Sequence, residues 1–437
     1  MNKFITTIKN IFAIEDLRTR ILNTLFFIAI YRLGSYVVLP GVDPSRLDAK
    51  SGGIFGILDT LVGGAFSHAS IFALGIMPYI SASIVLQLLT IAVPYFQKLQ
   101  KEGESGRKKI NQYTRLLTIP IVMAQSVGFI ATLNQDALVN PGVFFTVSTM
   151  IILTAGTLFC MWLGEKITDK GIGNGISMII MIGIVSRFPG AIIQEAAAKG
   201  MRGSLIFLIE LAVLFFIVMG VIILTQAVRQ IPVQYAKQVG GVSQLNAQRQ
   251  FIPLKVNAAG VMPIIFAQSL MFVPAIAASA WKDSETANYI GQKFSDYTSW
   301  QHNVGFAVLI ILFTYFYTAI SVNPKQIADD LKRSGGFVPG VKPGDATSEY
   351  IDQVLTHITL PGAVALALIA IFPAIALLFG VTRPFSAFYG GTSLIIMVGV
   401  VLDTMNQIES YLLMRHYDGM MKTGKLKGRT QNIALAS

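Results

Sequence analysis

The chain has 437 residues, of which 53% are hydrophobic and only 13% are charged, and its formal net charge is +11. A soluble domain carries about 25% charged residues, so water is not the solvent for most of this protein. The apolar residues come in continuous runs of about twenty, the length of a membrane-spanning helix, and lack the alternation of a barrel strand. The composition therefore predicts an all-α integral membrane protein.

Ten apolar runs are predicted to span the membrane. Because the number is even, both termini lie on the same side. Most of the 34 lysines and arginines fall on that side, which makes it the cytoplasmic one. This bias accounts for the positive net charge, so DNA is not an expected partner. The predicted spans are Ile21–Val38, Ile71–Val93, Leu116–Leu133, Phe144–Leu163, Gly173–Phe188, Leu205–Val228, Ala258–Ala280, Val304–Val322, Leu360–Phe379 and Thr392–Leu413.

The spans divide into two sets of five, and an odd number per half inverts one half relative to the other. Two loops, 229–257 and 323–359, are polar, basic and longer than a connection needs. They are predicted to dock a cytosolic partner, with a disordered surface as the alternative. The expected organisation is a cytosolic amphipathic segment (1–20), an N-terminal half (21–188), an external hinge connection (189–203), a C-terminal half (204–413) and a cytosolic tail (414–437).

No stretch of the sequence predicts bond chemistry. Residues 419–426 have the spacing of a phosphate loop up to its lysine, but lack the Ser or Thr that would hold Mg²⁺. The glycine-rich segment 171–175 (GIGNG) links two spans and follows no strand, so we expect a tight turn and not a dinucleotide site. The histidines are dispersed and Cys160 is the only cysteine, so neither a metal site nor an intrachain disulfide is expected.

Charged residues inside spans are functional candidates by default. Arg32 and Glu210 lie near the outer ends of their spans, and we interpret both as side chains that reach the interface. A carrier coupled to ions would need more buried charges, paired across helices. A secondary transporter for a small solute, built on inverted repeats, is therefore the weaker alternative.

Residues 52–89 combine a short glycine-bounded helix, a Gly-Gly break and a longer apolar helix. Ile80 and Ile84 are one helical turn apart and share a face. A narrow apolar constriction resists hydration and holds ions back. Packing against a neighbouring helix or lipid explains the same spacing, and from spacing alone it is the favoured interpretation.

Motifs spread over the whole chain resemble those of the SecY family, the central subunits of the Sec protein-translocation channel. The resemblance implies ten transmembrane helices in two inverted five-helix halves around an hourglass pore, with a plug helix and a lateral gate between the second and seventh helices. The motifs are Ser70–Gln87 (SIFALGIMPYISASIVLQ), Trp162–Ile180 (WLGEKITDKGIGNGISMII), Lys101–Arg115, Ile231–Gln238, Pro253–Pro263, Asn323–Asp345 and Gly390–Ser393.

By the same resemblance, four groups of residues carry the function. The pore ring comprises Ile80, Ile84, Ile176, Ile180, Ile265 and Ile396. The plug, at about 54–64, comprises Ile54, Phe55, Ile57, Leu58, Leu61, Gly63 and Gly64. The lateral gate comprises Ser83, Gln87, Asn257, Gly260 and Pro263. The partner-docking loops present Arg229, Lys237, Arg249, Lys255, Lys332, Arg333 and Lys342. Lys342 stands where the family usually carries arginine; lysine keeps the charge but loses the planar fork.

The implied function is a protein-conducting channel and not an enzyme. It passes unfolded secretory polypeptides across the bacterial plasma membrane and releases transmembrane segments sideways into lipid. A partner ATPase or ribosome and the membrane potential supply the energy, and no cofactor or metal is implied. The implied partners are SecE-like and SecG-like small membrane subunits, a SecA-like motor ATPase, the translating ribosome, signal sequences, nascent chains and the lipid bilayer.

Overall fold

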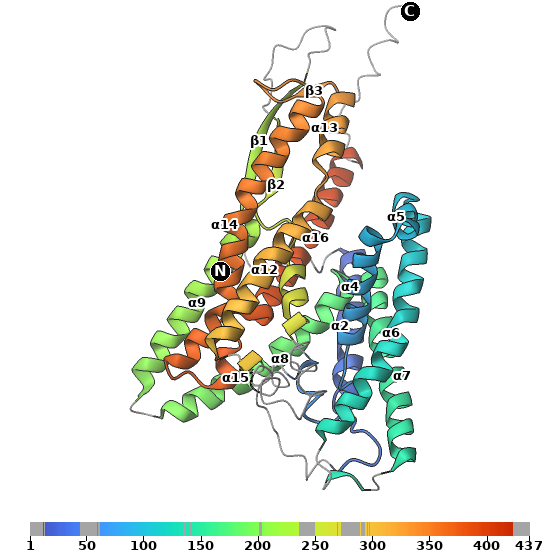
Figure 1. Cartoon of the computed structure of the whole chain (residues 1–437), viewed down its shortest axis with the longest axis vertical. Helices are drawn as coiled ribbons and strands as arrows, with labels where there is room; N and C mark the ends of the chain where they lie inside the picture. Colours follow the sequence, from blue (N-terminus) through green and yellow to red (C-terminus); the bar gives the residue numbers. More distant parts are fainter. Residues whose placement is uncertain are drawn as a thin grey trace, which may run out of the picture. The chain divides into compact units, whose positions relative to one another are not determined.

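The chain forms two compact units. The computed structural model describes residues 12, 14–43, 59, 62–133, 137–139, 142–200, 203–235, 250–268, 270–271, 289, 293–294, 296 and 298–422. The boundary between the units falls inside two long helices, α8 (Gly175–Lys199) and α16 (Gly391–Lys422) (Figure 1). The first unit comprises Met1–Asp48, Val62–Gly183 and Val400–Ser437, and the second comprises Ala49–Leu61 and Ile184–Gly399.

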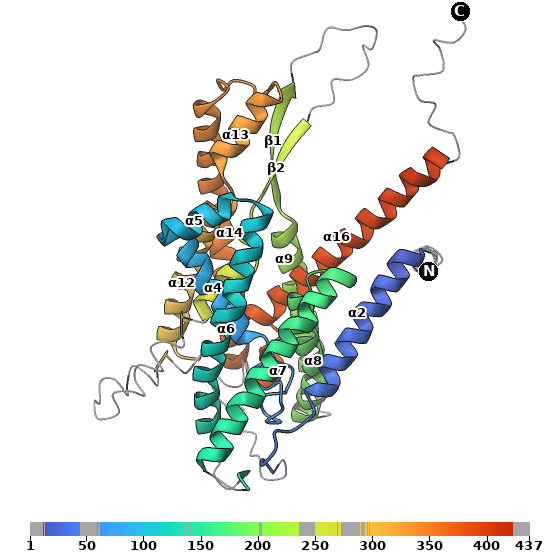
Figure 2. The same cartoon turned by 90° about the vertical axis from the view of Figure 1, so that its right-hand side faces the viewer.

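The first unit is a helical layer built around α7 (Val143–Lys170), which packs against both α2 (Glu15–Gly34) and α6 (Glu104–Thr132) (Figure 2). Two further helices, α4 (Met77–Ala92) and α5 (Pro94–Lys101), pack on α6. Almost every residue of α7 is apolar or small, so it buries side chains on several faces, as expected for a helix inside a membrane bundle.

The second predicted span begins later than we expected. The sequence predicts a span from Ile71, whereas residues 63–76 form turns and α4 begins only at Met77. Gly75 has a φ of 51°, which ends any helix that precedes it, and Pro78 lies in the first turn of α4, where its missing N–H has no cost.

The second unit contains α9 (Ser204–Gln226), α12 (Trp300–Ser321) and α14 (Asp345–Leu378), with α14 packed against the other two. The short α15 (Arg383–Ser386) follows α14. Residues 184–199 belong to α8, which continues through Pro189 to Lys199.

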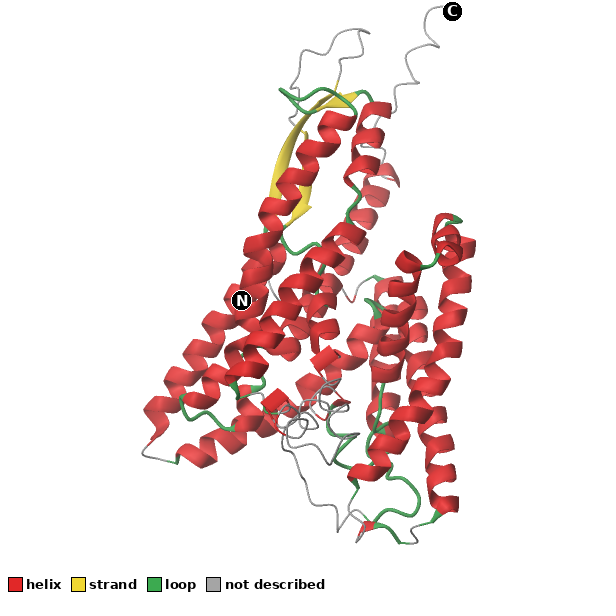
Figure 3. Cartoon of the chain, in the orientation of Figure 1, coloured by secondary structure: helices red, strands yellow, loops and turns green. Residues whose placement is uncertain are grey.

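The two long polar loops fold together as one module. A three-stranded antiparallel sheet forms in the order β2 (Gln250–Lys255), β1 (Val228–Tyr235), β3 (Gly336–Phe337) (Figure 3). With α13 (Pro324–Arg333) and residues 345–358 of α14, we call it the sheet module. Its core contains Ile231, Val233, Leu254, Leu331, Val338, Ile351 and Leu355. The described parts of both loops are therefore packed structure, and the disordered-surface alternative is wrong for them.

The described residues contain seven helices that are long and apolar enough to cross a membrane. The pair Met77–Thr90 and Pro94–Gln100 would make an eighth if it is one broken span. The two predicted spans that are still missing from this set each have an identifiable reason. α2 carries Glu15, Asp16, Arg18 and Arg20 in its first turns, and much of the seventh predicted span lies outside the described residues. The chain is a multi-pass membrane protein, and its ten-helix count stays a prediction.

The sheet module is predicted to depend on the side chain of Ile351, which is fully buried in its core. Ile351→Ala should destabilise the module by about 2–5 kcal/mol, because it removes buried methyl groups and leaves a cavity. The measurement is the rate of limited proteolysis within 229–257 in the detergent-solubilised protein, which should rise. Gln353→Ala, two residues away on the exposed face, is the control and should not change this rate.

Candidate functional site

The GIGNG segment forms the tight turn that its composition predicts. It connects the end of α7 to the start of α8. Asn174 caps α8, because its Oδ1 accepts hydrogen bonds from the backbone N–H groups of Ile176 (3.1 Å) and Ser177 (3.2 Å). The Oγ1 of Thr168 accepts from the N–H of Gly175 at 2.9 Å and donates to the carbonyl of Gly164 at 3.0 Å.

Glycines allow α7 and α8 to approach closely at this turn. A Cβ at Gly175 would lie 1.9 Å from the carbonyl oxygen of Gly164, and one at Gly164 would lie 3.0 Å from the Cγ1 of Ile176. Gly173 has a φ of 82°, and a Cβ there would lie 3.0 Å from the Oγ1 of Thr404. The geometry thus requires glycine at these positions for packing and not for phosphate binding.

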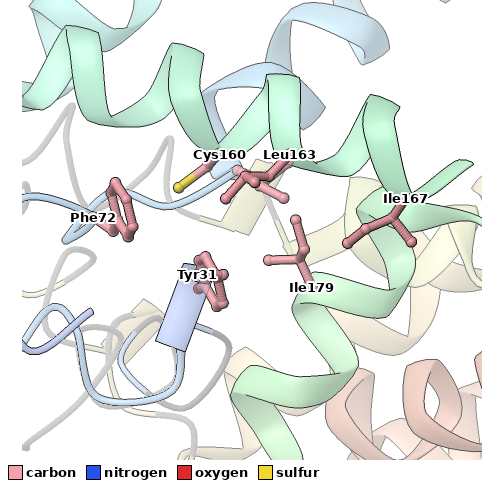
Figure 4. Close-up of a cluster of buried hydrophobic side chains, with 7 residues drawn as sticks. Tyr31, Phe72, Cys160, Leu163, Ile167 and Ile179 are labelled. Atoms are coloured by element: carbon pink, nitrogen blue, oxygen red, sulfur yellow. The ribbon is translucent and has the colours of Figure 1, made fainter. Parts of the chain in front are cut away.

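Four of the six predicted ring isoleucines lie in the first unit, on α4 and α8. Ile80 and Ile176 both pack against one buried cluster. Ile84 and Ile180, one turn further along each helix, are 7% and 8% exposed. The cluster comprises Tyr31, Phe72, Ile76, Cys160, Leu163, Ile167 and Ile179 from α2, the 63–76 segment, α7 and α8, and its side chains point toward one another (Figure 4). One core therefore packs against an isoleucine of each helix, Ile80 on α4 and Ile176 on α8.

The other two ring isoleucines lie in the second unit. Ile265 is half-buried in the helical stretch 262–268, and Ile396 is 4% exposed in the first turns of α16. At Gly399 α16 approaches this stretch closely, since a Cβ there would lie 3.3 Å from the Cγ2 of Val261. The joining of all six isoleucines into one ring stays a prediction.

The predicted plug lies mostly outside the described residues, which include none of Ile54, Phe55, Ile57, Leu58 and Leu61. Its predicted hinge is described. Gly63 and Gly64 have φ values of 71° and 92°, a conformation that favours glycine. A Cβ at Gly63 would lie 2.7 Å from the Cα of Gly183.

Arg32 has a role at this hinge that the sequence did not reveal. Its guanidinium donates to the carbonyl of Gly63 at 2.8 Å and to the hydroxyl of Tyr36 at 3.1 Å. Tyr31, beside it on α2, donates to the carbonyl of Val62 at 3.4 Å. Whether or not Arg32 reaches the interface, it also holds the backbone beside the Gly-Gly pair.

The predicted gate residues are found in two separate groups. On α4, the Nε2 of Gln87 donates to the Oγ of Ser83 at 3.2 Å. In the second unit, Gly260 has a φ of 64° and Pro263 is buried at the start of a helix. Asn257 is 6% exposed, and its Oδ1 has no hydrogen-bond partner among the described residues. Their assembly into a gate stays a prediction.

The sheet module exposes basic and acidic side chains in similar numbers, and the basic ones include five of the predicted docking residues. Arg229 and Lys255 extend from β1 and β2, Lys332 and Arg333 end α13, and Lys342 precedes α14. All five side chains are exposed, and none forms an ion pair within the described part of the chain. The other two predicted docking residues, Lys237 and Arg249, lie outside the described residues.

A buried charge cluster in the second unit was not predicted. The Nζ of Lys199 lies 2.9 Å from Glu210 and 3.5 Å from Glu195, and donates to the carbonyl of Gly380 at 2.9 Å. Both the N–H (2.8 Å) and the hydroxyl of Thr382 donate to Glu195. Glu210 is only 8% exposed, so its interpretation as an interfacial side chain is wrong. The cluster ties α8 and α9 to the segment after α14.

No catalytic or metal site emerges from the same residues. Within the part of the chain that the structure describes, no three His, Cys, Asp or Glu side chains gather as metal ligands. Cys160 is fully buried in the apolar cluster described above. The described features are close helix packing, apolar side chains near the starts of two helices, and a sheet module with exposed charged side chains.

Residues 70–405 match the family model named SecY. The chain belongs to the SecY family. It is 44% identical over 432 residues to the protein translocase subunit SecY of Halalkalibacterium halodurans, with 95% of this chain and 99% of the relative covered. It is 42% identical over 432 residues to the Bacillus subtilis protein of the same name, with the same two shares covered.

Solved structures of channels share the fold. The structure described as that of a protein conducting channel has a TM-score of 0.64 and 15% identity, with 95% of each chain covered. A SecY structure concerned with the plug domain and the closed state has a TM-score of 0.61 at 17% identity and the same coverage. Canine Sec61 in a ribosome-channel complex has a TM-score of 0.59 at 14% identity, again with 95% of each chain covered.

Membership of the SecY family makes the chain a channel subunit and not an enzyme. The expectation of a protein-conducting channel is thereby confirmed, and the alternative of a small-solute transporter is not favoured. The predicted ring, gate, plug and docking residues remain assignments from motifs, and the geometry above locates those that the structure describes.

The turn between α7 and α8 is predicted to tolerate no side chain at Gly175. Gly175→Ala places a methyl group against the Gly164 carbonyl, and backbone cannot yield as a flexible side chain does. Overpacking of this kind costs about 1–3 kcal/mol or more. The expected result is a lower yield of monodisperse protein and a lower unfolding midpoint in detergent.

Gly128→Ala in α6 is the matched control for this prediction. A Cβ at Gly128 meets no atom within 4 Å, and alanine is the better helix former. This variant should keep the yield and the unfolding midpoint. Equal behaviour of the two variants would contradict the packing argument.

Proposed function

We propose that this chain is the pore-forming subunit of a translocase in the bacterial plasma membrane, with both termini in the cytoplasm. The observation that carries the proposal is the near-complete alignment, at 44% identity, to a protein named as a translocase subunit. The charge bias of the sequence supports the orientation. The substrates are unfolded secretory polypeptides, and apolar helices leave sideways into lipid.

In this proposal the six isoleucines form the narrowest part of the pore. A ring of aliphatic side chains resists hydration, so ions are held back when no polypeptide is present. Aliphatic side chains also adjust to a passing chain of irregular outline. The support is the packing of Ile80 and Ile176 against one shared core, together with the burial of Ile84 and Ile180.

The plug and the gate control the closed state. The proposed plug, 54–64, ends at a glycine pair whose backbone is held by Arg32 and Tyr31. The proposed gate uses the small and polar side chains on α4 and around Asn257, which separate without the loss of a large packed surface. A signal sequence shifts the channel toward the open state because it binds that state better.

The sheet module is the proposed docking surface for the partners that supply energy. Five of its exposed basic side chains, Arg229, Lys255, Lys332, Arg333 and Lys342, are the proposed contacts for an acidic surface of a motor ATPase similar to SecA, or for the phosphates of ribosomal RNA. Canine Sec61, which shares the fold, is named as part of a ribosome-channel complex. Small membrane subunits similar to SecE and SecG complete the proposed complex.

Deletion of residues 54–61 is predicted to raise the resting ion conductance of the reconstituted channel. The deletion removes the proposed stopper and leaves only the isoleucine ring to exclude water. The measurement is single-channel conductance in planar bilayers without a translocating substrate. Unchanged conductance would count against the plug assignment and leave the ring assignment standing.

A photoreactive amino acid at position 80 or 265 is predicted to crosslink to a secretory chain stalled in transit. Both positions belong to the proposed ring and would touch any polypeptide in the pore. The same probe at Phe144, an exposed apolar position at the start of α7, is the control and should give no crosslink to the stalled chain. Absence of crosslinks from both ring positions in an actively translocating complex would overturn the ring assignment.

A further inference from the structure

The turn at 171–175 is held by side chains from α2. The hydroxyl of Thr24 on α2 accepts a hydrogen bond from the N–H of Ile172 at 3.0 Å, and it donates to the carbonyl of Arg20 at 2.9 Å. Asn23 donates to the carbonyl of Lys170 at 3.2 Å. Thr24 is only 7% exposed, so its hydroxyl replaces water as the partner of a buried N–H.

Arg20 reaches the same turn from one helical turn earlier on α2. Its guanidinium donates to the carbonyl of Gly171 at 3.3 Å. The same group lies over the ring of Tyr411 on α16, 5.3 Å from the ring centre. α2 and α16 therefore contact each other beside this turn.

The last helix supplies a second acceptor. The Oε1 of Gln407 on α16 accepts from the N–H of Gly173 at 2.9 Å. Gly173 is buried, and Thr404 on α16 lies against its Cα. Two backbone donors of the turn, on Ile172 and Gly173, are thus paired with side chains of two other helices.

The position of this turn decides where α8 begins. Asn174 caps α8 directly after the turn, and Ile176 follows as its second residue. Ile180 lies one turn further along the helix. The two isoleucines of the proposed ring on α8 therefore lie a few residues after Ile172 and Gly173. The backbone N–H groups of those two residues are hydrogen-bonded to side chains of α2 and α16.

We propose that Thr24 and Gln407 are positioning residues for the pore ring. Thr24 on α2 and Gln407 on α16 hold the 171–175 turn by hydrogen bonds to its backbone, an arrangement we call the clamp. The clamp thereby fixes the start of α8 and keeps Ile176 and Ile180 in the constriction of the closed channel. This inference rests on the proposed function, because it requires that these isoleucines line the pore. The inference adds that a movement of α2 or α16 reaches the ring through the hydrogen bonds of Thr24 to Ile172 and of Gln407 to Gly173.

The test uses two substitutions of similar size at each position, one that removes the hydrogen-bond acceptor and one that keeps it. Each variant is made in the complete channel complex and reconstituted into salt-loaded vesicles. Thr24→Val and Gln407→Met remove the acceptor and leave a buried N–H unpaired, which shifts the closed-to-open ratio by about tenfold. Ion leak at rest should rise, and a precursor with a defective signal sequence should be translocated. Thr24→Ser and Gln407→Glu keep an acceptor at the same place and should restore the wild-type leak and selectivity.

Asn406→Ala is the neighbouring control, since Asn406 is exposed on α16, and it should behave as wild type. Equal leak in the acceptor-keeping and acceptor-removing variants would overturn the clamp, as would wild-type leak in both Thr24→Val and Gln407→Met. If Thr24→Val fails to assemble, the half-exposed Gln407 pair decides the question alone.

Ile180→Gly separates this inference from the function on which it rests. If Ile180→Gly raises the leak and the acceptor-removing variants do not, the clamp is wrong and the ring stands. If Ile180→Gly does not raise the leak, the ring assignment itself is wrong at this position.

Discussion

A backbone N–H that is buried away from water needs an acceptor, and a turn inside a helical membrane bundle cannot supply all of its own. The 171–175 turn meets this requirement with side chains. Thr24 and Gln407 accept from Ile172 and Gly173, and Thr168 accepts from Gly175. The close packing of α7 on α8, the cap at Asn174 and the isoleucines that follow all depend on this satisfied turn.

At the hinge beside the proposed plug, a charged side chain satisfies a backbone group in the same way. Arg32 brings a cation to the carbonyl of Gly63, and its second amino group pairs with Tyr36. The Lys199 cluster uses an ammonium to join two carboxylates and a carbonyl. In each case a long cationic side chain stabilises irregular backbone near a helix end, which apolar packing cannot do.

The sequence predicted the features that depend on residues close together in the chain. Long apolar runs became helices, and the glycines of GIGNG became a tight turn. The start of α4 was misplaced because the positive φ of Gly75 is a tertiary outcome. The hydrogen bonds of Arg32 and the ion pair of Glu210 could not be predicted, because their partners lie mostly on other segments and spacing does not reveal them. The alternation of Ile231 and Val233 was a strand signal within a loop, and pairing with β3, about a hundred residues away, completed it. The site assignments came from motifs and not from physical pattern.

The length of α14 has a mechanical consequence. Its first residues belong to the core of the sheet module, through Ile351 and Leu355, and its later residues form an apolar span that packs against α12 and α9. At 34 residues it is about 51 Å long, given a rise of 1.5 Å per residue. α14 contains Pro361 and Pro373, and each removes a backbone hydrogen bond from the helix interior. The helix nevertheless continues without a loop from the sheet module into the apolar span. A movement of the sheet module is therefore passed to the membrane span by helix, and the two prolines mark where that helix bends most easily.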